Sequence, residues 1–137
     1  MPAVHIAVVN DDAAFLDLMA ELLDGEGYRA TLHHGRPIVH PALRRDPPDL
    51  VILDLRMADP DSGWELLQLL RLAPALRAIP VLMCSGDVRF LASRAADLRA
   101  KGCDTLAKPF DLEELLAKID ALLAVGAVGG GGALRAE

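Results

Sequence analysis

The chain is poor in several kinds of residue, and each shortage excludes a class of protein. It has only two cysteines, Cys84 and Cys103, and they lack the spacing of a metal site or a disulfide framework, as is typical of proteins in a reducing compartment. No apolar run reaches the roughly 18 residues that a membrane-spanning helix needs. His5 and Asn10 interrupt the first apolar stretch too early for a signal peptide. We therefore expect a cytoplasmic protein that does not contact a membrane.

Basic residues are also scarce, and phosphate-binding loops are missing. The 14 Lys and Arg residues are outnumbered by 20 Asp and Glu residues, which gives a net charge of -6. This balance argues against a broad basic face for nucleic acid. Neither a Gly-x-Gly-x-x-Gly sequence nor a P-loop is present. What remains is a chain of 137 residues, 53% of them hydrophobic, which is enough for the core of one domain.

Five short segments of the chain have the composition of β-strands. Three are nearly continuous apolar runs, as expected for parallel strands that are covered on both faces: Val4–Val9, Leu50–Leu53 and Ile79–Cys84. Two others, Tyr28–His33 and Asp104–Ala107, are more polar, and we expect them at or near the edges of the sheet.

Stretches with helical spacing of apolar residues lie between and after these strands. They cover Phe15–Leu23, Trp64–Leu72, Val88–Ala100 and Leu112–Leu123, with a weaker stretch at Pro37–Arg45 that Pro41 should disturb. Five β-α units in succession predict a doubly wound parallel sheet with right-handed crossovers. The domain should span residues 1–125, and the segment 126–137, rich in Gly and Ala, should be a flexible tail.

Polar residues follow the predicted strands at the point where each strand ends. They are Asn10, Asp11 and Asp12 after the first strand, Asp54 after the third, Ser85 after the fourth and Lys108 after the fifth. Because parallel strands end at one edge, these side chains should converge there. Asp12 could equally be a helix cap, and either Ser85 or Asp87 could cap the fourth helix. The four histidines show no ligand spacing, and we interpret them as structural or surface residues.

This combination of groups predicts phosphoryl chemistry. Carboxylates at one edge attract a hard cation such as Mg²⁺, which prefers oxygen ligands. Such a cation offsets the charge of an incoming phosphoryl group, while a lysine and a hydroxyl hold its other oxygens. Asp54 would then be the nucleophile and would form an acyl phosphate.

Four motifs make the chain resemble the receiver domains of two-component response regulators over about residues 4–124. They are VVNDD at 8–12, LVILDLRM at 50–57, VLMCSGD at 81–87 and KPF at 108–110. The resemblance implies a flavodoxin-like (βα)5 fold with strand order 2-1-3-4-5. It also implies a cis bond between Lys108 and Pro109.

The resemblance also assigns a role to each motif residue. Asp54 matches the phosphoacceptor, Asp11 matches a metal-binding carboxylate, and the main-chain carbonyl of Arg56 matches a further ligand of Mg²⁺ or Mn²⁺. Ser85 and Lys108 match the groups that contact the phosphoryl oxygens. The chain would thus be an acceptor and switch, promoting its own phosphotransfer and dephosphorylation, and would not belong to an enzyme class.

Partners are implied in the same way. A sensor histidine kinase or a histidine phosphotransfer protein would supply the phosphoryl group. No output domain follows in the sequence, so we expect a stand-alone receiver that signals by contact with an unknown downstream protein. It should be a monomer or a weak homodimer.

Three departures from the family pattern leave a second interpretation open. Asn10 stands where the family has an acidic residue, so it would reach the metal only through a water. Thr105 replaces the aromatic residue that couples the site to the output surface, and the loop Met57–Gly63 lacks the usual Met-Pro pair. The alternative is a pseudo-receiver that binds partners with little or no phosphorylation.

Two other functions fit the sequence less well. A phosphatase of haloacid-dehalogenase type would need an Asp two residues after its nucleophile, where this chain has Arg56. A flavodoxin-type flavin domain would need a phosphate-binding loop in place of Asn10, Asp11 and Asp12.

Overall fold

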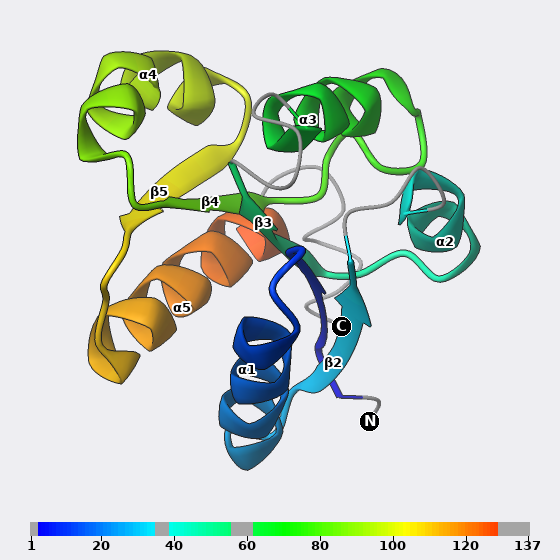
Figure 1. Ribbon diagram of the computed structural model, residues 1–137. Helices are drawn as coiled ribbons and strands as arrows, with labels where there is room; N and C mark the ends of the chain where they lie inside the picture. The colour runs from blue at the N-terminus through cyan, green and yellow to red at the C-terminus, as the bar shows by residue number, and fades with distance from the viewer. Residues whose placement is uncertain (1–2, 35–38, 56–61, 129–137) are drawn as a thin grey trace.

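The computed structural model describes residues 3–34, 39–55 and 62–128 as five strands alternating with five helices (Figure 1). The strands are β1 (His5–Val9), β2 (Arg29–His33), β3 (Leu50–Asp54), β4 (Val81–Ser85) and β5 (Cys103–Ala107). The helices are α1 (Ala13–Gly25), α2 (Val39–Arg45), α3 (Ser62–Leu72), α4 (Val88–Ala100) and α5 (Leu112–Val128).

All five strands pair in parallel in the order β2-β1-β3-β4-β5. This confirms the predicted fold class and strand order, including the two polar strands at the edges. Every residue of β1, β3 and β4 is buried, because helices cover both faces of the sheet. The reversal of strand order lies between β1 and β3, so that the carboxyl ends of these two strands flank the crevice where open sheets of this type bind ligands.

The helices form two layers, one on each face of the sheet (Figure 1). One face packs on α2, α3 and α4, whose buried apolar residues include Leu43, Leu67 and Leu91. The other face packs on α1 and α5 through Leu16, Ile119 and their neighbours. Within the described part of the chain, no helix combines the length and the apolar character required to cross a bilayer.

Two helices differ from the sequence prediction, one at an internal proline and the other at its carboxyl end. Pro41 lies in the first turn of α2, where its missing N–H has no helical partner to lose, so the helix forms around it. Helix α5 continues through Gly126 to Val128, past the start of the predicted tail. A single Gly costs only about 1 kcal/mol in a helix, and the preceding run of Leu and Ala is strongly helix-forming. The remaining tail residues, 129–137, lie outside the described residues.

Candidate functional site

The first part of the site is the turn that follows β1. Asn10 is 1% exposed, and its Oδ1 accepts a hydrogen bond of 2.8 Å from the backbone N–H of Asp12. Asp12 is the N-cap of α1 and accepts from the N–H groups of Ala14 and Phe15. Asp12 therefore has a structural role. The intervening Asp11 is exposed, just beyond the carboxyl end of β1.

Asp54 is the last residue of β3 and is 8% exposed. Its Oδ2 lies 3.3 Å from Nζ of Lys108, which follows β5. The ammonium group of Lys108 also sits 4.7 Å from the ring centroid of Phe15, the first aromatic residue of α1. Phe15 in turn meets Phe110 edge to face. Lys108 is thus held between a buried carboxylate and the face of an aromatic ring, two contacts that both favour a cation.

Ser85 ends β4 and connects the site to α4. The residue is 3% exposed, and its Oγ accepts a hydrogen bond of 2.9 Å from the backbone N–H of Asp87. The Asp87 carboxylate accepts from the N–H of Phe90 and is the N-cap of α4. Of the two candidate caps, the structure therefore uses Asp87. The Ser85 hydroxyl instead closes the turn that leads into the helix.

Gly63 is a site residue that the sequence prediction missed. It lies in the first turn of α3, and its backbone packs against the end of β3. A Cβ at this position would lie 2.7 Å from the Cα of Leu55 and closer still to the carbonyl oxygens of Asp54 and Leu55. Only glycine allows this approach. The available signal was a glycine directly before the apolar helix.

Cys84 lies in β4 directly before Ser85 and is buried. Burial raises the pKa of its thiol to about 12, an effect that Lys108 partly opposes. The thiol therefore stays protonated and is a packing residue.

The remaining predicted residues lie away from this group or outside the description. Thr105 is half-buried in the middle of β5, where it pairs with Met83. Arg56 and most of the loop 57–63 lie outside the described residues. The bond between Lys108 and Pro109 is cis, as the resemblance implied.

The described donor atoms fit a hydrated hard cation. No group of three or more His, Cys, Asp and Glu side chains among the described residues is placed to hold a metal ion. Mg²⁺, however, keeps several waters and is commonly held by only one or two carboxylates. Asp54, at the end of β3, and Asp11, two residues after the end of the adjacent β1, supply that number.

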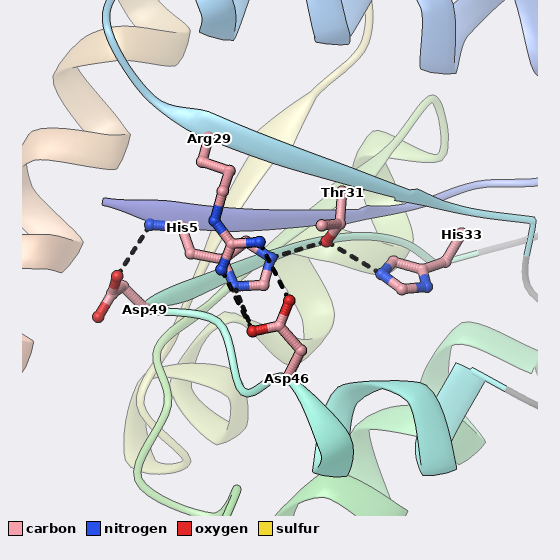
Figure 2. Close-up of polar contacts among 6 residues, drawn as sticks. All are labelled: His5, Arg29, Thr31, His33, Asp46 and Asp49. Atoms are coloured by element: carbon pink, nitrogen blue, oxygen red, sulfur yellow. Dashed lines mark hydrogen bonds and ion pairs between the residues drawn. The ribbon is translucent and has the colours of Figure 1, made fainter. Parts of the chain in front are cut away.

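A second group of polar residues lies on the face of the sheet beneath α2, along β2 and at the start of β1 (Figure 2). Nε2 of His5, in β1, lies 2.8 Å from Oγ1 of Thr31, which lies 3.1 Å from Nε2 of His33. Arg29 makes two hydrogen bonds to Asp46, of 3.1 and 3.2 Å. The sequence prediction treated the histidines as scattered, but strand pairing brings two of them to one hydroxyl.

Comparison with known proteins gives one family. The model of the response regulator receiver domain matches residues 6–120. The response regulator MprA of Mycobacterium bovis is 37% identical over 121 residues, which are 88% of this chain and 51% of that protein. The chain thus spans about half the length of the curated relatives that it matches.

Solved structures show the same fold. The chemotaxis protein CheY4 of Vibrio cholerae aligns with a TM-score of 0.76 and 21% identity, over 88% of this chain and 99% of that one. A CheY-like receiver domain protein of Methanospirillum hungatei aligns with a TM-score of 0.78 and 23% identity, over 94% and 100%.

Proposed function

The chain belongs to the response regulator receiver domain family, and from that premise we propose that it is a phosphorylation-controlled switch with Asp54 as the acceptor. The observation that carries this proposal is the Asp54–Lys108 pair, a buried carboxylate 3.3 Å from an ammonium group. Ser85 ends the neighbouring β4, and Asp11 lies two residues after the end of β1 on the other side. A carboxylate, an ammonium group and a hydroxyl thus lie at the carboxyl ends of the strands, which supports the proposal.

In the proposed reaction, a carboxylate oxygen of Asp54 attacks the phosphorus of a phosphohistidine on a partner protein. The P–N bond breaks, its electron pair leaves with the imidazole, and an aspartyl phosphate forms on this chain. The partner would be a sensor histidine kinase or a histidine phosphotransfer protein.

Lys108 and Ser85 would stabilise the product. Lys108 already faces Asp54, so its ammonium group can follow the added negative charge onto a phosphoryl oxygen. The Ser85 hydroxyl can donate to another phosphoryl oxygen once it turns away from the N–H of Asp87. The rotation of the Ser85 hydroxyl would change the turn that leads into α4, and this change could transmit the signal.

Asp11 and Asp54 would hold a Mg²⁺ or Mn²⁺ ion, together with the main-chain carbonyl of Arg56. The ion would offset charge on the phosphoryl group during transfer. Asn10 would contribute through a water, although its Oδ1 already serves the Asp12 amide.

Signalling would proceed through contact with another protein in the cytoplasm, by a monomer or a weak homodimer. The second candidate function is a pseudo-receiver, and the role of Asn10 favours it. A buried amide in the turn after β1 lowers the negative charge available to a metal.

The test is incubation of the chain with Mg²⁺ and a small phosphoryl donor such as phosphoramidate, followed by intact-mass measurement. We expect the mass to rise by one phosphoryl group in the unsubstituted chain and to stay unchanged in Asp54→Asn. Asp12→Asn is the matched control, since Asn caps a helix as well as Asp does, and it should still be modified. Modification that persists in Asp54→Asn would refute the acceptor assignment. No modification of the unsubstituted chain would favour the pseudo-receiver.

A further inference from the structure

Three contacts connect α3 to α4 and to Lys101, the residue directly after α4. The guanidinium carbon of Arg94, in α4, lies 5.2 Å from the ring centroid of Trp64, in α3. Nζ of Lys101, directly after α4, lies 4.9 Å from the same ring. At the far end of α3, Nε of Arg71 donates a hydrogen bond of 2.7 Å to the carbonyl of Lys101. Both helices lie on the same face of the sheet (Figure 1).

The ring of Trp64 is thus shared by two cations, one from α4 and one from the residue that caps its carboxyl end. Arg94 also lies 5.5 Å from the ring of Phe90, one turn earlier in α4. Its ion pair with Asp97 is long, at 3.8 Å, and exposed, so it competes weakly for the guanidinium. The aromatic contacts therefore favour the position of Arg94 beside Trp64.

The residues on both sides of these contacts are also joined to the proposed phosphorylation site. Trp64 follows Gly63, whose backbone is packed against the carbonyl of Asp54. Phe90 donates its N–H to Asp87, and the N–H of Asp87 is bonded to the Ser85 hydroxyl. A movement of Ser85 toward a phosphoryl group would release the turn that begins α4, while Trp64 still holds the middle and the end of that helix.

We propose that Trp64 is a positioning residue that holds α4 against α3 in the unphosphorylated chain through Arg94 and Lys101. The inference rests on the proposed function, since it assumes that the acyl phosphate on Asp54 draws Ser85 away from Asp87. The contacts with Trp64 oppose the displacement of α4. Weakening them makes the displaced state easier to reach, and any ligand that favours that state then binds more tightly.

The experiment uses beryllofluoride with Mg²⁺ as a phosphoryl mimic, titrated into the whole chain. Amide NMR shifts at Asp54 measure binding, and the fluorescence of Trp64, the only tryptophan, reports on the contact with α4. Arg94→Ala removes one cation from the ring. Arg99→Ala removes the same charge from an exposed position on the same helix and is the matched control. Circular dichroism checks that both variants fold.

We expect the mimic to change Trp64 emission in the unsubstituted chain, and Arg94→Ala to bind it about two- to fivefold more tightly. Arg99→Ala should bind like the unsubstituted chain, and Arg94→Lys should recover part of the difference because it keeps a cation near the ring. A purely structural contact would change stability without changing this affinity.

Two outcomes would overturn the inference, and they differ in what they say about the site. Equal affinities for Arg94→Ala and Arg99→Ala, with clear shifts at Asp54, would remove the role of Trp64 and leave the proposed function intact. No shifts at Asp54 in the unsubstituted chain would refute both proposals.

Discussion

Polar side chains gather at two places on the sheet, at the carboxyl ends of its strands and beneath α2, and the two groups are built in different ways. At the carboxyl ends, Asp54 and Ser85 are the last residues of β3 and β4, Lys108 directly follows β5, and two of the three are buried. The group beneath α2 consists of His5, Thr31, His33, Arg29 and Asp46, from two strands and the end of a helix (Figure 2).

The difference lies in how each group satisfies its hydrogen bonds. Beneath α2, one hydroxyl contacts two rings and one guanidinium makes two bonds to a single carboxylate, so most of these groups bond one another. Among the buried side-chain atoms of the described residues in this group, only Nδ1 of His5 lacks a hydrogen-bond partner. At the carboxyl ends, the Ser85 hydroxyl bonds a turn amide, and Lys108 meets Asp54 at a longer 3.3 Å. Contacts of this kind can be exchanged for a ligand. A cluster of polar side chains alone therefore does not distinguish the two groups, whereas the exchangeability of their partners does.

The largest effect is expected at the carboxyl end, from Gly63→Ala. The added Cβ would meet the backbone of Asp54 and Leu55, which cannot move without disturbing β3. We expect a loss of about 3 kcal/mol in the free energy of unfolding, as for severe overpacking. Chemical denaturation measures this loss. Such a result would show that the carboxyl end depends on a close approach of backbone, which the group beneath α2 does not use.

Gly25→Ala is the matched control for that substitution. Gly25 ends α1, and a Cβ there would meet no atom within 4 Å. Ala should therefore leave the stability unchanged or raise it by about 0.5 kcal/mol. If the two variants were equally stable, the packing argument for Gly63 would be wrong.

A smaller effect is expected beneath α2, from Thr31→Val. The Thr31 hydroxyl has one proton and two lone pairs, so it can donate to one histidine ring while it accepts from the other. Val has nearly the same shape but leaves both ring nitrogens without this partner. We expect the free energy of unfolding to fall by about 1–2 kcal/mol.

Thr105→Val, in β5 and outside this group, is the matched control, since Thr31 and Thr105 are the only threonines of the chain. It should cost clearly less in the same denaturation measurement. Equal losses would mean that the two contacts made by Thr31 contribute little.

The two groups also differ in how far the sequence could predict them. The apolar runs predicted β1, β3 and β4, and the rule that ligands meet the carboxyl ends of strands then placed Asp54, Ser85 and Lys108 together. Such predictions need only the identity of each strand and its direction. The contact of His5 with Thr31 depends in addition on the register of β1 against β2, which pairs His5 with Arg29 and Ala7 with Thr31. Nothing in the two segments reveals that register.

Gly63 and the end of α5 were missed for related reasons. The approach of Gly63 to β3 depends on how α3 packs over the sheet, which its own sequence does not show. The Gly and Ala content beyond Gly126 indicated a tail, but α5 continues to Val128 from an apolar, helix-forming run that packs on the sheet.

The smallest effect is a dependence of stability on pH that arises beneath α2. Burial lowers the pKa of His5, and the charge of Arg29 lowers it further, so the folded chain disfavours a proton that the unfolded chain accepts. The contribution of His5 is therefore fully present above the unfolded value of about 6.5 and is lost as the pH falls below it. The pKa of His33 is lowered as well, first by burial and then by His5.

Between pH 7.5 and pH 5.5 we expect the free energy of unfolding to decrease, and to decrease less in His5→Gln. His34→Gln, at an exposed histidine after β2, should behave like the unsubstituted chain. An unchanged pH dependence in His5→Gln would show that protonation of His5 does not affect folding, so that the two groups would differ in geometry alone.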